Sequence, residues 1–210
     1  MTEKHEWRKK EKALYFPKAK PEVIEVPAFR FLMVKGEGSP QETMFSNCIS
    51  ALYSVSYAIK MTLKKTAPQP DGYRDYTVYP LEGIWSLNQK AIEAFDGTLN
   101  KNDFIYTLMI RQPDFITPDF FSAMVEVAKK KTANDLLDTL TFDTFAEGKC
   151  IQMLHVGSFD NEPASFALME NFADEQGLQR LSKAHREIYL SDFRKVSPEK
   201  LNTVLRFRVT

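Results

Sequence analysis

One order of expected secondary structure occurs twice along the chain. The stretches FLMVKGEGSPQETMFSNCISAL, from Phe31, and IQMLHVGSFDNEPASFALMENF, from Ile151, both contain an apolar strand, a glycine turn, a proline near a helix start and a phenylalanine soon after. Two further strand-like runs follow each of these stretches. The repeat therefore predicts an α+β fold made of tandem βαββ modules with a pseudo-two-fold repeat and antiparallel sheets.

The repeat also divides the chain into parts. The whole chain is expected to be one domain, 1–210, made of an N-terminal arm over about 1–20, module one over about 21–112, a helical connector over about 113–147 and module two over about 148–210. The arm is rich in lysine, and Trp7, Leu14 and Tyr15 are expected to pack it onto the body.

Turn and capping residues set the expected element boundaries. In module one we expect a strand over 23–36, a helix over about 40–65 and strands over 76–87 and 104–110, the helix starting at a capping box formed by Ser39 and Glu42. In the connector we expect one helix from Pro118 and a second helical stretch from Leu136 that ends near Gly148. In module two we expect a strand over 149–157, a helix over 162–177 and strands over 184–190 and 203–209.

Composition and missing motifs exclude several classes of function. The 28 basic and 28 acidic side chains cancel, which argues against direct nucleic-acid binding, because phosphate contacts need a positive excess. We find no apolar run long enough for a membrane span and no secretory signal, and the two cysteines suit a reducing cytoplasm. The spacing of the three histidines fits no metal site, and no phosphate-loop or dinucleotide motif is present. The sequence thus predicts a cytoplasmic protein without metal or organic cofactor and leaves any protein partner open.

The surplus of aromatic side chains suggests a ligand site. If one helix covers one face of each sheet, the opposite faces can leave a central ligand cleft between the modules. In the run HREIYLSD, the side chains of His185, Glu187 and Tyr189 alternate with those of the next residues, which include isoleucine and leucine. We assign the set with isoleucine and leucine to the core, and His185, Glu187 and Tyr189 to the cleft. Trp85 and Tyr106 of module one are best placed to join these three residues.

A carboxylate among aromatic rings has three possible uses. Burial can raise its pKa, so that it acts as an acid or base near neutral pH. It can instead pair with a cationic ligand whose flat rings stack on tryptophan and tyrosine. It can also be a strand glutamate in a salt bridge with an arginine. Glu82 competes with Glu187 as the equivalent carboxylate of module one.

Several segments together resemble the GyrI-like small-molecule-binding family, and in particular its free-standing branch. The resemblance runs from about residue 7 to the C-terminus and rests on WRKKEKALYFPKAKPEVIEVPAFRFLMVKGEGSP, ALYSVSYAIK, YPLEGIWSL, HREIYLSD and KLNTVLRFRV. It implies the tandem βαββ fold with a ligand cleft. Relatives serve as drug-sensing domains of multidrug-responsive regulators, in which a buried glutamate meets aromatic, often cationic ligands. Some free-standing relatives are similar to hydrolases of cyclopropane-bearing, DNA-alkylating natural products.

The resemblance also implies roles for particular residues. Glu187 corresponds to the catalytic glutamate that activates water, and Tyr106 supplies a catalytic hydroxyl for the developing oxyanion. The ligand-binding residues that we expect are Trp85, Tyr79, Tyr189 and His185.

Three functions follow as hypotheses. The first is a cofactor-independent hydrolase of cyclopropanoid compounds that protects against xenobiotics. The alternative is a non-catalytic protein that sequesters hydrophobic or cationic small molecules. A third, an inhibitor of another protein such as DNA gyrase, needs an acidic patch that this neutral sequence does not indicate. Because the strand pattern starts by residue 23, we expect no DNA-binding module.

Overall fold

The computed structural model describes residues 3–94 and 96–210. It confirms a mixed α+β fold with antiparallel strands, and it confirms the strand–helix–strand–strand order in both halves. The chain forms two compact units that differ from the predicted modules. The second unit takes the N-terminal segment Arg8–Ala28 and the segment Pro80–Ser86 in addition to Ala146–Thr210.

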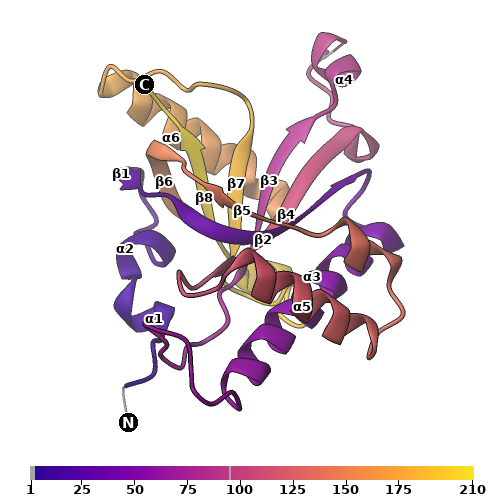
Figure 1. The fold of residues 1–210 in the computed structure, drawn as a ribbon. Coiled ribbons are helices and arrows are strands. Elements are labelled where there is room, and N and C mark those ends of the chain that lie inside the picture. Colours follow the sequence, from indigo (N-terminus) through magenta and orange to yellow (C-terminus); the bar gives the residue numbers. More distant parts are fainter. Residues whose placement is uncertain (1–2, 95) are drawn as a thin grey trace. The chain divides into compact units, whose positions relative to one another are not determined.

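The first unit contains a three-stranded antiparallel sheet and two helices that lie against one another (Figure 1). Its central strand pairs with one neighbour on each side, in the order β4-β2-β5. Its elements are β2 (Phe29–Glu37), α3 (Thr43–Leu63), α4 (Gln89–Glu93), η1 (Lys101–Asp103), β4 (Phe104–Gln112), α5 (Pro118–Lys129), η2 (Asp135–Thr139) and β5 (Thr141–Phe145).

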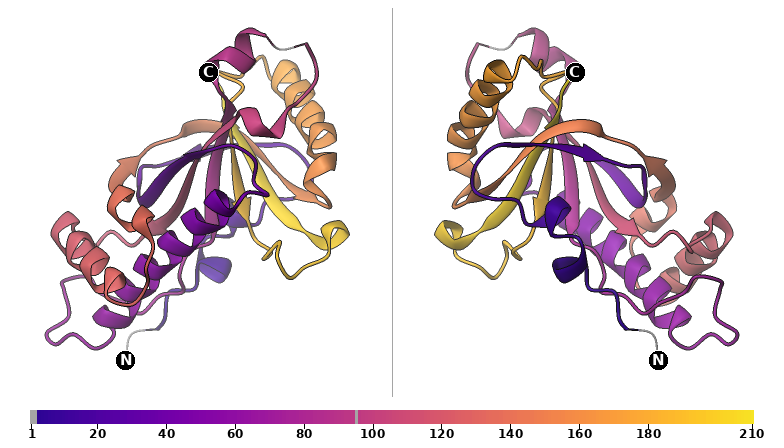
Figure 2. Two further views of the ribbon diagram at one scale, coloured as in Figure 1. Left: turned by 90° about the vertical axis from the view of Figure 1, so that its right-hand side faces the viewer. Right: turned by 90° about the vertical axis from the view of Figure 1, so that its left-hand side faces the viewer.

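The second unit contains a five-stranded antiparallel sheet in the order β1-β6-β8-β7-β3, with α6 packed along β6 (Figure 2). Its elements are α1 (Trp7–Lys10) from its second residue, α2 (Lys12–Tyr15), β1 (Glu22–Val26), β3 (Leu81–Leu87) without its last residue, β6 (Gly148–Val156), η3 (Phe159–Asn161), α6 (Glu162–Glu175), β7 (His185–Tyr189), η4 (Pro198–Lys200) and β8 (Asn202–Arg208).

Several local predictions were wrong. The single strand expected over 23–36 is two strands, β1 and β2, which have different pairing partners. The strand expected over 76–87 begins only at Leu81. The helix α3 begins at Thr43, and the hydroxyl of Ser39 accepts a hydrogen bond from the backbone of Gln41 instead of capping the helix. The second helical stretch of the connector is the short η2 turn followed by the strand β5. The apolar spacing there is too short to separate a helix from a strand, and pairing with β2 decides for the strand.

Two of the three residues expected to pack the N-terminal arm are buried, and Leu14 is partly exposed. The side chains of Trp7 and Tyr15 are buried, and the Trp7 indole N–H donates to the carbonyl oxygen of Val78 within the first unit. No helix within 3–94 or 96–210 has both the length and the apolar character needed to cross a membrane.

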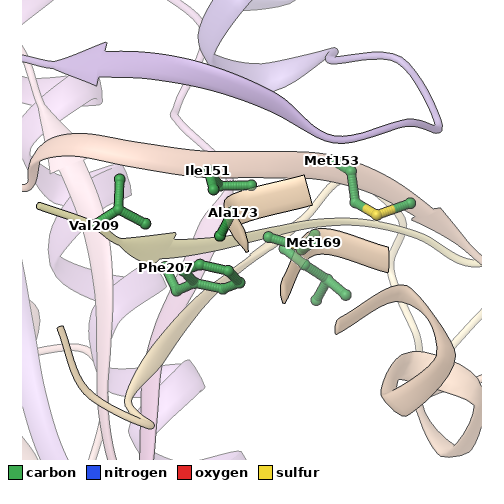
Figure 3. Packing of buried hydrophobic residues seen from close by; sticks show 7 residues of the cluster. Ile151, Met153, Met169, Ala173, Phe207 and Val209 are labelled. Carbon is green, nitrogen blue, oxygen red and sulfur yellow. The ribbon is translucent and has the colours of Figure 1, made fainter. Parts of the chain in front are cut away.

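The core of the second unit fills the space between α6 and the sheet. Figure 3 shows six labelled members of this core, which consists of Ile151, Met153, Met169, Ala173, Leu205, Phe207 and Val209. The α6 residues in it are four apart, as expected for the apolar stripe of a helix. The face of the sheet that carries Leu205 and Phe207 is therefore the face that α6 covers.

Gly36 lies directly opposite Tyr106 across the β2–β4 pair of the first unit. A Cβ atom added at Gly36 would lie 2.3 Å from the Cε2 atom of the buried Tyr106 ring. We expect Gly36→Ala to lower the free energy of unfolding by about 1–3 kcal/mol, because the ring must move in a filled core. Urea unfolding measures this loss. The exposed neighbour Lys35→Ala should change stability by less than about 0.5 kcal/mol. Equal losses in both variants would contradict the contact.

Candidate functional site

Strand pairing in the second unit gathers four of the predicted site residues on one sheet face. Trp85 on β3 lies directly opposite His185 on β7. Glu187 and Tyr189 follow at two-residue steps, so their side chains emerge on the same face as that of His185. We call Trp85, His185, Glu187 and Tyr189 the Glu187 cluster.

A chain of hydrogen bonds joins the Glu187 cluster. The indole N–H of Trp85 donates to the hydroxyl of Tyr189 at 2.8 Å, and this hydroxyl donates to Oε2 of Glu187 at 2.8 Å. The Nε2 atom of His185 lies 3.1 Å from Oε1 of Glu187. Because an ionised carboxylate only accepts hydrogen bonds, the Nε2–H group of His185 is the donor. Both oxygens of Glu187 are thus held in place.

The Glu187 cluster lies on the sheet face that α6 covers, which reverses the sequence-based assignment. Glu187 pairs with Leu205 of the core, and the ring of Phe166 on α6 contacts the ring of His185 edge-on, with centroids 4.6 Å apart. The sequence analysis took the alternate face for the core because it carries Ile188. That face instead holds buried charges.

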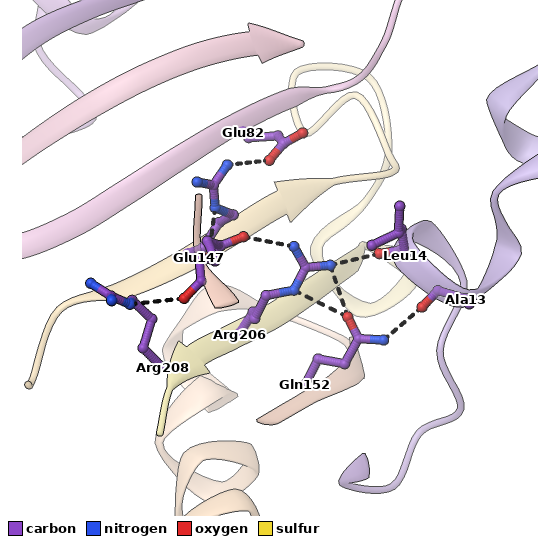
Figure 4. Close-up of polar contacts among 8 residues, drawn as sticks. Ala13, Leu14, Glu82, Glu147, Gln152, Arg206 and Arg208 are labelled. Carbon is purple, nitrogen blue, oxygen red and sulfur yellow. Dashed lines mark hydrogen bonds and ion pairs between the residues drawn. The ribbon is translucent and has the colours of Figure 1, made fainter. Parts of the chain in front are cut away.

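Those buried charges form one network within the second unit, part of which is labelled in Figure 4. Arg186 donates to Glu82 at 2.5 Å and pairs with Glu147 at 3.0 Å, and Arg206 donates to the other oxygen of Glu147 at 2.9 Å. Burial raises the pKa of Glu147, but the two guanidinium groups outweigh it and hold that pKa below its usual range. Glu82 is thus an ion-pair partner on the face opposite Glu187.

The same network fastens part of the N-terminal segment. Arg206 donates to the carbonyl oxygen of Leu14 at 2.8 Å, and the amide of Gln152 donates to the carbonyl oxygen of Ala13 at 2.7 Å (Figure 4). Arg206 also donates to Oε1 of Gln152. The polar network behind the Glu187 cluster therefore joins four strands, β3, β6, β7 and β8, and α2 into one framework.

Aromatic side chains surround the phenol of Tyr189. The ring of Phe159, from η3, stands edge-on to the Tyr189 ring at 6.0 Å, and the ring of Phe193 lies 5.8 Å from it. Phe159 and Phe193 also contact each other at 6.2 Å. Both phenylalanines are half-buried, whereas Glu187 is only 8% exposed. The carboxylate therefore lies beside a group of rings with partial solvent access.

Glu162, the first residue of α6, is a site residue that the sequence analysis missed. Its side chain is 7% exposed, and its Oε1 atom is buried without a hydrogen-bond partner. Burial and the negative charges of Glu187 and Asp160 raise its pKa to about 10. Its position could have been found from the sequence, because it precedes Phe166 and Met169 by four and seven residues on the apolar stripe of the helix.

A buried histidine ties the start of α6 to the sheet. The Nδ1 atom of His155 lies 2.9 Å from the hydroxyl of Ser165, and its Nε2 atom lies 3.0 Å from the carbonyl oxygen of Ser158. A carbonyl only accepts, so Nε2 carries the hydrogen and Nδ1 accepts from Ser165. These bonds hold the first turn of α6, and with it Glu162, in a fixed position over β6.

The other two predicted residues lie in the first unit. Tyr106 faces α3, where its ring contacts the Phe45 ring edge-on at 5.2 Å, so it does not lie on the open sheet face expected from the sequence. Burial raises the pKa of Tyr106. Tyr79 lies under the guanidinium of Arg111, which is 4.6 Å from the ring centroid, and near His5.

Within 3–94 and 96–210 no three His, Cys, Asp or Glu side chains are arranged to hold a metal ion. The site described by these contacts contains two buried carboxyl groups next to aromatic rings. Glu187 is hydrogen-bonded at both oxygens, and Glu162 has an oxygen without a partner. Such an arrangement can exchange protons with a bound molecule and can stack on its flat surfaces.

Known proteins similar to this chain match nearly all of its length. The model of the GyrI-like small molecule binding domain matches residues 19–210. A crystal structure of a hydrolase from Listeria innocua has 38% sequence identity and a TM-score of 0.87, with 99% of this chain and 100% of that chain covered. A protein from the same organism, described as uncharacterized and conserved, has 39% identity and equal TM-score and coverage.

A more distant likeness concerns the fold alone. The C-terminal domain of EcmrR has 11% identity and a TM-score of 0.55, over 91% of this chain and 97% of that domain. No protein of curated function matches the chain in sequence.

Proposed function

Because the chain belongs to the GyrI-like small-molecule-binding family, we propose that it binds a flat hydrophobic or cationic molecule at the Glu187 cluster and hydrolyses electrophilic, cyclopropane-bearing compounds. The observation that carries this proposal is the carboxylate of Glu187, held at one oxygen by Tyr189 and at the other by His185. A positioned carboxylate beside rings suits both the binding of such a molecule and the activation of water.

The proposed reaction adds one water molecule across a strained carbon–carbon bond. The oxygen of water bonds to a cyclopropane carbon while Glu187 takes its proton. The ring carbon–carbon bond breaks, and its electron pair moves to a conjugated carbonyl oxygen, which then takes up a proton. A carboxylate offers about four acceptor positions, so the two hydrogen bonds leave acceptor positions for water. Burial, together with the charge of Glu187, raises the pKa of Tyr189 well above its usual value, so Tyr189 remains a donor.

Hydrolysis is supported by the Listeria innocua relative that is called a hydrolase. The proposed substrate class, cyclopropane-bearing compounds, rests on the family resemblance. The two proteins are 38% identical over nearly their whole length. Activity depends on the residues of the site and not on the fold. The Glu187 cluster is therefore the place to test it.

The alternative function is binding without chemistry, which sequesters a xenobiotic. The observation that favours it is the group of Phe159, Tyr189 and Phe193 next to a carboxylate, since rings and a negative charge together attract a flat cation. This function predicts saturable binding of a cationic dye with no change in ligand mass after long incubation.

Glu187→Gln separates the two functions. Incubation of the wild-type protein with a spirocyclopropyl dienone should add the mass of one water, measured by mass spectrometry. Glu187→Gln keeps the shape but removes the base, so we expect turnover to fall about a hundredfold while the compound still binds.

The matched control is Glu199→Gln, at an exposed glutamate outside the Glu187 cluster, which should leave turnover unchanged. Undiminished turnover in Glu187→Gln would exclude Glu187 as the base. Saturable binding with no mass change in the wild-type protein would favour the non-catalytic function.

A further inference from the structure

We propose that Glu162 is a second acid of the site, which holds a proton at neutral pH and donates it to the carbonyl oxygen of a bound carbonyl-bearing molecule. This inference rests on the proposed function for its role in turnover. It goes beyond that function in naming the proton donor and in requiring a carbonyl acceptor on the ligand.

The geometry around Glu162 supports a neutral carboxyl group. A buried carboxylate normally accepts several hydrogen bonds, because an unpaired buried charge is costly. Glu162 is 7% exposed, and its Oε1 atom has no hydrogen-bond partner. The Oε1 atom of Glu162 is therefore available for a hydrogen bond to a ligand bound at the Glu187 cluster.

The charges near Glu162 act in the same direction. Glu187 on β7 and Asp160 on η3 both disfavour a second negative charge, and burial disfavours it further, so its pKa rises to about 10. The other ionisable groups close by are Tyr189 and His185 on β7, both bonded to Glu187, and His155 on β6, bonded to Ser165 of α6. The helix N-terminus favours a carboxylate by about 0.3–1 kcal/mol, which is too little to offset burial beside two acids.

When the pKa values of two neighbouring carboxyl groups differ strongly, one group can act as a general acid and the other as a general base. In the proposed hydrolysis, Glu187 takes a proton from water as the carbon–oxygen bond forms, and Glu162 gives its proton to the carbonyl oxygen that receives the electron pair. One water is added to the ligand, and one proton must then return from Glu187 to Glu162 before the next cycle. No oxidant or reductant takes part.

The experiment uses infrared spectroscopy and turnover on the same full-length variants. The probe is a spirocyclopropyl dienone. In the wild-type protein at pH 7.5, a carbonyl stretch from a protonated carboxyl group should be present, and it should disappear in Glu162→Gln but not in Glu175→Gln, an exposed glutamate on the same helix. The carbonyl band of the bound probe should shift to lower frequency in the wild-type protein and not in Glu162→Leu. Turnover should fall at least tenfold in Glu162→Gln.

The outcomes distinguish this inference from the proposed function. Loss of the protonated-carboxyl band only in the Glu162 variants, with a shifted probe carbonyl but no added water, would retain the inference and reject hydrolysis. Turnover at the wild-type rate in Glu162→Gln, or a wild-type protein without the protonated-carboxyl band, would overturn the inference while leaving the role of Glu187 intact.

Discussion

Arg186→Ala is expected to lower the free energy of unfolding by about 3–5 kcal/mol. The guanidinium of Arg186 is almost fully buried and pairs with Glu82 and Glu147. Removing it leaves the buried carboxylate of Glu82 without its ion-pair partner and Glu147 with Arg206 alone. The cost is mainly that of uncompensated buried charge and not the loss of the attraction itself.

Urea unfolding followed by fluorescence measures this loss. The matched control is Arg194→Ala, whose guanidinium forms an exposed ion pair with Asp192, and which should cost less than about 1 kcal/mol. If Arg186→Ala does not fold, the variant Glu147→Gln provides a milder test, because it keeps hydrogen-bonding groups next to both arginines. A loss below 1 kcal/mol in Arg186→Ala would show that the network is not needed for stability.

Glu162→Gln is expected to stabilise the protein at pH 7 by about 3 kcal/mol, while it lowers activity. The pKa of Glu162 is raised from an ordinary value of 4.5 to about 10 in the folded protein. Between these values the folded state binds one more proton than the unfolded state. The stability of the wild-type protein therefore falls by about 1.4 kcal/mol per pH unit as the pH rises from 4.5, and a neutral amide has no such dependence.

Unfolding of both proteins at pH 4, 7 and 8.5 tests this expectation. The difference between Glu162→Gln and the wild-type protein should be close to zero at pH 4 and should grow with pH. Glu175→Gln, an exposed change on the same helix, should give no growing difference. A constant difference across the pH range would mean that Glu162 is ionised in the folded protein.

The sequence predicted the composition of the site better than its position in the fold. Alternation along HREIYLSD placed His185, Glu187 and Tyr189 on one face, and the structure has them hydrogen-bonded in that way. The assignment of that face failed, because Ile188 was taken as a mark of the core while its neighbour Arg186 is also buried. Hydropathy alone cannot identify a buried arginine whose partners lie on other strands.

Which side chains the predicted aromatic residues contact also depended on the pairing of the strands. Trp85 belongs to the first half of the sequence, but β3 pairs with β7, and this brings its indole to Tyr189. Tyr106 faces α3 instead, since β4 presents it on the side where Phe45 lies. A one-residue change of register reverses the face of every side chain in a strand, and strand pairing sets that register.

The sequence by itself determined most of the local elements, the repeated strand–helix–strand–strand order and the family. Turn residues, side-chain periods of two and 3.6, and family motifs are local properties. Only the tertiary structure decided which sheet face α6 covers, which charges are buried as pairs, and that Glu162 lies within the electrostatic reach of Glu187. These features depend on contacts between residues distant in sequence, whose energies arise only when the strands pair and the helix packs.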